Sequence, residues 1–262
     1  MDLTLKNRLL TALALCCLFS SVNTLALDRK TPEYLQEAFI EVAMRNEYDS
    51  GKHQIRKWQQ PLRIWLDHRV GDEQKHTRLA TMHIEHLAAI TGHELQLATS
   101  LEQSNVHLVF TRQSRWTQEV ADLLGAGAVK NLHSAVCIAS VKVNSVGEIM
   151  KAWVVIPVDQ AQMHGKLVAC VVEELTQIMG LPNDSDKVFP SIFNDKTPQN
   201  LLSGLDGLLL KMLYYSEVTP GMSEDKVKRV LTPLLDSWEK DGTITNADKE
   251  IRRGKLYPLL GY

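Results

Sequence analysis

The chain has 262 residues, of which 44% are hydrophobic and 23% are charged. These values are close to those of soluble globular proteins and exclude a largely disordered chain, a collagen-like repeat and a polytopic membrane protein. The formal net charge of −2 gives no basic excess, so the composition does not support nucleic-acid binding. No repeat period typical of solenoids or propellers recurs.

The N-terminus has the layout of a secretory signal peptide. Lys6 and Arg8 form a positive region ahead of an apolar run over residues 9–22. Thr24 and Ala26 then place small residues at positions −3 and −1 of a cleavage site. Because the apolar run is short for a transmembrane helix, we favour cleavage over an uncleaved membrane anchor. We therefore expect a periplasmic or secreted protein with no stable membrane span after cleavage.

Hydrophobic periodicity and capping residues predict the elements that follow. Predicted helices cover residues 31–48, 73–91, 116–124, 166–179 and 198–215, and Thr197 is the predicted N-cap of the last of these. A final helix starts near Ser223, and Pro233 should break or kink it. Predicted strands cover residues 62–67, 94–99, 106–111, 135–143 and 149–158. This order predicts an α+β fold, in which helices pack on a mixed β-sheet.

Two cysteines remain after removal of the leader, Cys137 and Cys170. A lone pair in an exported chain usually forms a disulfide, so we predict a bridge between them. The alternative is a catalytic thiol at Cys137 with His133 as its base. We favour the bridge, because a thiolate in an oxidising compartment needs protection.

Residues 173–183 read E-E-L-T-Q-I-M-G-L-P-N. In the zinc-peptidase motif H-E-x-x-H-x-x-G-x-x-H, three histidines bind the metal and the glutamate polarises its water. Here Glu173, Gln177 and Asn183 occupy the three ligand positions. Glu174 occupies the position of the general base, and Gly180 that of the glycine at which the chain turns.

The region resembles the matrixin-like metzincins, which implies a zincin-like fold. Residues 191–194 fall where those proteins have a methionine-containing turn, with Phe193 in place of the methionine, and residues 205–214 are similar to the helix that follows. With this resemblance we divide the chain into a signal peptide (1–26), a helical lead-in (27–56), a zincin-like domain (57–215) and a helical C-terminal tail (216–262).

A closer resemblance is to an uncharacterised family of exported proteins from Gram-negative bacteria, domain of unknown function 2927. This family brings no established activity. The matching phrases are residues 61–64, 90–93, 173–177, 180–185, 191–195 and 220–222.

The substituted ligand positions bear on the chemistry. A set of one carboxylate and two amides is a poor zinc site, because zinc favours histidine and cysteine with at most one carboxylate. An oxygen set suits Ca²⁺, Mg²⁺ or Mn²⁺ better than zinc, although this one would bind weakly. Three interpretations stay open: an active zinc peptidase, an oxygen-ligated metal site, and a metal-free domain whose polar helix face serves binding.

We favour the last interpretation. The chain would be a pseudo-peptidase that binds a peptide, a protein or a cell-envelope component in the former substrate cleft. The alternative is a metal-dependent hydrolase in which Glu174 is the general base and Glu173 helps to hold a hard cation. The sequence leaves open whether the protein is an enzyme.

Other patterns are less informative. His83 and His86 have a spacing that allows them to share a metal, but helix-face histidines near the core are the simpler interpretation. Residues 184–186 lack the glycine and distal glutamate of an EF-hand loop, which favours a solvated loop. No G-x-S-x-G elbow, P-loop or dinucleotide fingerprint occurs.

Overall fold

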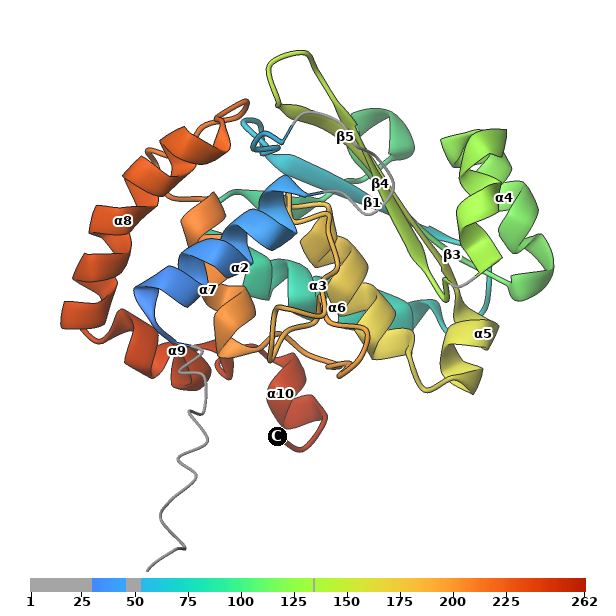
Figure 1. Cartoon of the computed structure of the whole chain (residues 1–262). Coiled ribbons are helices and arrows are strands. Elements are labelled where there is room, and N and C mark those ends of the chain that lie inside the picture. The colour runs from blue at the N-terminus through green and yellow to red at the C-terminus, as the bar shows by residue number, and fades with distance from the viewer. Residues whose placement is uncertain (1–29, 46–52, 134) are drawn as a thin grey trace, which may run out of the picture.

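The computed structural model describes residues 30–45, 53–133 and 135–262. The predicted signal peptide and the end of the first predicted helix lie outside these ranges. The described chain contains a five-stranded mixed sheet with helices on both faces (Figure 1), which confirms the α+β class. The strands are β1 (Leu62–His68), β2 (Leu95–Leu97), β3 (Val106–Thr111), β4 (Ile138–Val143) and β5 (Ile149–Pro157).

Most predicted helices are present, and several short ones were not predicted. The α-helices are α2 (Pro32–Met44), α3 (Glu73–Thr91), α4 (Trp116–Leu124), α5 (Val158–Met163), α6 (Leu167–Gln177), α7 (Gly204–Leu213), α8 (Glu224–Lys240), α9 (Thr243–Ile251) and α10 (Leu256–Leu259). Short 3₁₀ segments are η2 (Leu101–Gln103), η3 (Gln113–Arg115) and η4 (Ala126–His133).

The strand order is β2-β1-β3-β5-β4. β1 pairs in parallel with β2 and β3, and β3 pairs in parallel with β5. β4 runs antiparallel to β5 and lies at the edge of the sheet. One face of the sheet packs into the large core with α2, α3, α6 and α7, while α4 and η4 cover part of the other face.

The two ends of the described chain pack together. α2 lies against α7 and α8, and α9 lies against α7 and α8. The Gln36 side chain on α2 donates a hydrogen bond to the Lys228 carbonyl on α8 at 3.2 Å. Apolar residues of both the lead-in and the tail therefore belong to the same core as the sheet.

The predicted start of the helix over 198–215 was wrong. α7 begins at Gly204, because Ser203 and Asp206 form a reciprocal capping box. The Ser203 hydroxyl accepts from the Asp206 N–H at 3.2 Å, and the Asp206 carboxylate accepts from the Ser203 N–H at 2.7 Å. These two bonds satisfy orphan donors of the first turn, which Thr197 does not do.

Three other expectations need correction. The predicted strand over 94–99 contracts to three residues, because only these pair with β1 before the chain leaves the edge of the sheet. Similarly, β4 begins at Ile138 rather than at residue 135. α8 continues through Pro233 without a break.

Gly92 ends α3 as predicted, whereas the helix predicted over 166–179 ends at Gln177, and Gly180 lies in the turn that follows. Gly92 has φ 66° and its N–H bonds to the Ala88 carbonyl, so it closes α3 in the left-handed conformation. Gly180 has φ +118°, and a Cβ there would lie 2.1 Å from the Arg56 carbonyl oxygen. Only glycine fits this turn, which directs the chain from α6 into the loop carrying Asp184.

Candidate functional site

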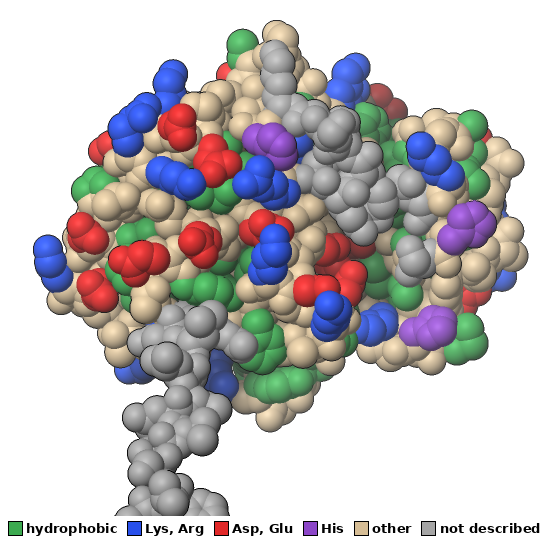
Figure 2. Space-filling model, viewed as in Figure 1, with side chains coloured by type: hydrophobic (Ala, Val, Ile, Leu, Met, Phe, Trp, Pro, Cys, Tyr) green, Lys and Arg blue, Asp and Glu red, His purple; other side chains and the backbone are tan. Residues whose placement is uncertain are grey.

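A cleft of about 630 Å³ lies between the edge strand β4 and helix α6. β4 and the residues before it form one wall, and the polar face of α6 forms the other. The helix contributes Glu173, Glu174 and Gln177, and the following loops contribute Asp184 and Asp195. Acidic side chains reach the surface beside this part of the molecule (Figure 2).

The disulfide predicted between Cys137 and Cys170 is confirmed. It joins the residue before β4 to α6, with the two Cα atoms 5.8 Å apart. Both cysteines line the cleft, so the bridge fixes its two walls to each other. The thiol of Cys137 is used in this bond, which argues against the alternative of a nucleophile paired with His133.

Three carboxylates meet at one end of the cleft. One oxygen each from Glu173, Asp184 and Asp195 lies within 4.8 Å of the other two. The Gln177 side chain donates to Asp184 at 3.1 Å, which places the amide beside the group. Glu174 is 5% exposed on the same helix.

The third predicted ligand position lies elsewhere. The Asn183 amide donates to the Glu41 carbonyl at 2.9 Å, and its N–H donates to the Val42 carbonyl at 3.2 Å. Asn183 therefore ties its loop to α2. Of the predicted ligand set, Glu173 and Gln177 line the cleft.

The loop that carries Asp195 is held by a buried carboxylate. Asp206 accepts from the Ser191 hydroxyl at 2.5 Å and from the Ile192 N–H at 3.2 Å. Burial raises the pKa of Asp206 to about 6, although these hydrogen bonds oppose the shift. Phe193 is fully buried beside them. The turn over 191–194 is thus fixed from α7, and this positions Asp195 at the mouth of the cleft.

The donor set does not fit zinc. Structural and catalytic zinc sites use imidazole or thiolate ligands, whereas this end of the cleft offers carboxylates and one amide. Carboxylate oxygens fit hard cations such as Ca²⁺, Mg²⁺ or Mn²⁺. Glu173, Asp184 and Asp195 are the residues that would hold such an ion.

His83 and His86 have structural roles. Thr176 donates its hydroxyl to the Val172 carbonyl at 2.6 Å, so His83 Nε2, 3.0 Å away, donates to the Thr176 oxygen. Burial lowers the pKa of His83 to about 3 and that of His86 to about 4. Both rings are therefore neutral near pH 7, and His83 joins α3 to α6. His86 lines a separate cavity of about 310 Å³.

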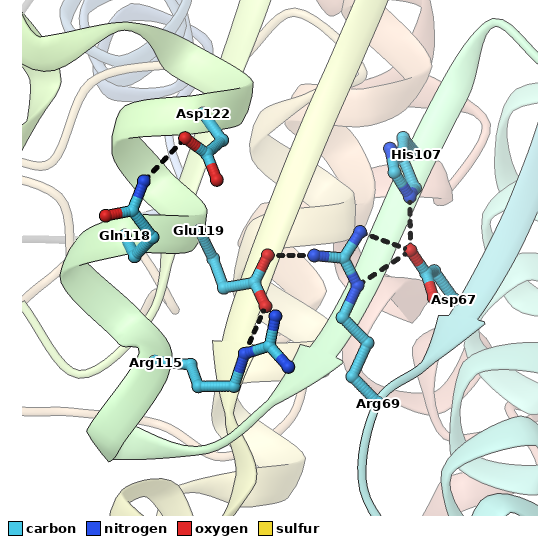
Figure 3. Close-up of polar contacts among 7 residues, drawn as sticks. All are labelled: Asp67, Arg69, His107, Arg115, Gln118, Glu119 and Asp122. Carbon is cyan, nitrogen blue, oxygen red and sulfur yellow. Dashed lines mark hydrogen bonds and ion pairs between the residues drawn. The ribbon is translucent and has the colours of Figure 1, made fainter.

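A second polar cluster fastens α4 to the sheet (Figure 3). Asp67 on β1 accepts from the Arg69 guanidinium at 2.6 Å and from His107 Nε2 at 2.9 Å. Arg69 also forms an ion pair with Glu119 on α4, and Glu119 forms a second ion pair with Arg115. Burial would raise the pKa of Asp67, but the Arg69 and His107 hydrogen bonds outweigh it and lower the pKa.

We expect Glu119→Gln to lower the free energy of unfolding by about 1–2 kcal/mol. Breaking a fully buried ion pair costs about 3–5 kcal/mol, and Glu119 is 3% exposed, but its partner Arg115 is 62% exposed and contributes little. Urea denaturation measures the change. Asp122→Asn, one turn further on the exposed side of α4, is the matched control and should leave stability unchanged. A Glu119→Gln variant as stable as wild type would contradict the role given to the cluster.

No helix among the residues that the structure describes is both long and apolar enough to cross a bilayer.

Comparison with known proteins gives one match. Residues 32–233 match the family described as protein of unknown function (DUF2927), which confirms the resemblance seen in the sequence phrases. No curated protein and no solved structure matches the chain. The matched span includes both walls of the cleft and all of the carboxylates described above. The chain belongs to the DUF2927 family of proteins of unknown function.

Proposed function

We propose that this protein is exported and binds an extended peptide segment of a partner protein in the cleft between β4 and α6. The observation that carries the proposal is that β4 is an edge strand whose side forms one wall of the cleft. No strand among residues 53–133 and 135–262 pairs with its outer edge. Unpaired edge strands bind extended peptides through main-chain hydrogen bonds, and pockets beside them select side chains.

The carboxylates at the end of the cleft indicate which charge the bound segment should carry. Glu173, Asp184 and Asp195 bring three acidic groups together, and a lysine or arginine side chain complements them. We therefore expect the bound segment to be extended and to carry a basic side chain.

A zincin-like architecture without the zinc triad accords with this proposal. An antiparallel edge strand beside the helix that carries Glu173 and Glu174 supports it, as does the glycine turn at Gly180. The missing imidazoles favour binding over zinc-dependent hydrolysis. The disulfide supports export, because such bonds persist in oxidising compartments.

A displayed library of random peptides tests the proposal. The full chain, purified after export, should enrich extended peptides with one or more basic residues. The double variant Asp184→Asn/Asp195→Asn should bind those peptides about fivefold or more weakly, because the charge pairs with the basic residue are lost. Asp225→Asn with Asp236→Asn, on α8, removes the same charge elsewhere and should have no effect. Absence of enrichment, or equal binding by both double variants, would contradict the proposal.

A second candidate is a cation-dependent hydrolase, favoured by the convergence of the three carboxylates. A hard cation held there would polarise a substrate carbonyl, and Glu174 would take a proton from the attacking water. Cleavage of a peptide library with Ca²⁺, Mg²⁺, Mn²⁺ or Zn²⁺ supplied, by wild type and Glu174→Gln, tests this. Cleavage lost in Glu174→Gln supports hydrolysis, and no cleavage by either protein removes this candidate.

A further inference from the structure

Two tryptophans lie in one row across the middle of the sheet. Trp65 on β1 pairs with His107 on β3, and His107 pairs with Trp153 on β5. Neighbours such as Ile64 and Val154 point into the large core. Because side chains alternate along a strand, the row Trp65–His107–Trp153 lies on the opposite face, which α4 partly covers. Figure 3 shows His107 of this row on the same side as α4.

α4 covers the next row of this face but not the tryptophans. Val109 and Val155 pack under α4 in the small core. Trp65 and Trp153 pack against neither hydrophobic cluster of the described chain, and both are half-buried. Neither indole N–H has a hydrogen-bond partner in the described ranges. Two such rings on an open sheet face are typical of a binding platform.

One side of the row is cationic, whereas the carboxylate on its other side, Asp67, is paired with Arg69 and His107. Arg63 precedes Trp65 by two residues and Lys151 precedes Trp153 by two, so both lie on the same face. Lys142 on β4 pairs directly with Lys151, an arrangement of like charges that is destabilising by itself. None of these three cations forms an ion pair with a described residue. An anionic ligand would relieve this repulsion.

We propose that this face binds an extended anionic polysaccharide, such as a chain of β-linked uronic acids. Trp65 and Trp153 are separated by two strand spacings, about 9–10 Å, which suits stacking on alternate sugar rings. Arg63, Lys142 and Lys151 would neutralise the carboxylates, and the indole N–H groups would donate to sugar oxygens. The inference is independent of the proposed peptide cleft, which lies at the edge of the sheet beside α6.

Single-stranded nucleic acid shares the combination of stacking faces and negative charge. The glycan is favoured for two reasons. The Cys137–Cys170 bridge indicates a compartment outside the cytosol, and the whole chain has a net charge of −2.

Tryptophan fluorescence titrations of the full, oxidised chain test the proposal. The probes are a β-1,4-linked mannuronate hexasaccharide, the neutral mannohexaose and hexathymidylate. The mannuronate should bind most tightly and lose affinity as salt rises, and the neutral oligomer should bind about tenfold more weakly. Trp65→Ala and Trp153→Ala should each weaken mannuronate binding about tenfold or more, whereas Trp65→Phe and Trp153→Phe should largely retain it.

A pair of charge variants distinguishes binding at this face from non-specific attraction of the anion to surface lysines. Lys142→Gln with Lys151→Gln should weaken mannuronate binding about fivefold or more, and Lys226→Gln with Lys240→Gln, on α8, should not. Calorimetric titration of the tryptophan variants, with melting curves, checks that binding is compared between folded proteins. No mannuronate binding, wild-type binding by folded Trp65→Ala or Trp153→Ala, equal binding of the neutral oligomer, or tighter binding of hexathymidylate would each overturn the proposal.

Discussion

Replacing Cys170 with serine is expected to lower the free energy of unfolding by about 3–4 kcal/mol, the range for a bridge that closes a loop of this length. Cys137 and Cys170 are separated by 33 residues, and the unfolded chain gains the freedom of that loop when the bond is lost. α6 would also lose its covalent link to β4, so the cleft should open locally before the rest of the molecule unfolds.

Urea denaturation of Cys170→Ser and of Cys137→Ser/Cys170→Ser measures this effect. Wild type treated with a reductant should fall to the stability of the double variant. Thiol labelling of unfolded, unreduced protein that lacks residues 1–26 provides the control, because no thiol should react. Two labelled cysteines per chain, or a double variant as stable as wild type, would contradict the prediction.

Acidification from pH 7 to pH 5 is expected to lower the free energy of unfolding by about 3 kcal/mol. Burial holds the pKa of His83 at about 3 and that of His86 at about 4. Below pH 6.5 the unfolded chain binds protons that the folded chain does not, so each histidine costs roughly 2 kcal/mol at pH 5. Burial also lowers the pKa of His76, which acts in the same direction.

Asp206 opposes this trend. Its folded pKa is raised to about 6, so the folded state binds a proton before the unfolded state does and gains roughly 1 kcal/mol at pH 5. Urea denaturation across this pH range measures the sum. His83→Gln keeps a hydrogen-bond donor for Thr176. This variant should lose about 2 kcal/mol less unfolding free energy than wild type between pH 7 and pH 5. A profile of His83→Gln parallel to that of wild type would show that His83 is not the source.

The order of elements could be read from the sequence because it rests on local signals. The apolar period of α3 and the glycine at residue 92 define a helix within the chain itself. The start of α7 was misplaced for a related reason: Thr197 and Ser203 are both good N-caps, and the capping box of Ser203 with Asp206 decides between them. The 3₁₀ segments have no comparable pattern, and they were missed.

The candidate site was only partly predictable. The spacing of Glu173 and Gln177 places both on one face of a helix. Asp195 reaches the same place through a turn fixed by Asp206, a long-range contact that spacing along the chain does not reveal. Trp65 and Trp153 become neighbours in one row only through the strand register.

The packing of α2 against α8 has a consequence for biosynthesis. The apolar residues of α2 belong to a core whose other members extend to Tyr257. An N-terminal helix of this kind stays exposed until the ribosome has made nearly the whole chain, and contacts between distant residues form slowly. The nascent chain should therefore remain open during synthesis, and it should close its core only after the residues up to Tyr257 have been made.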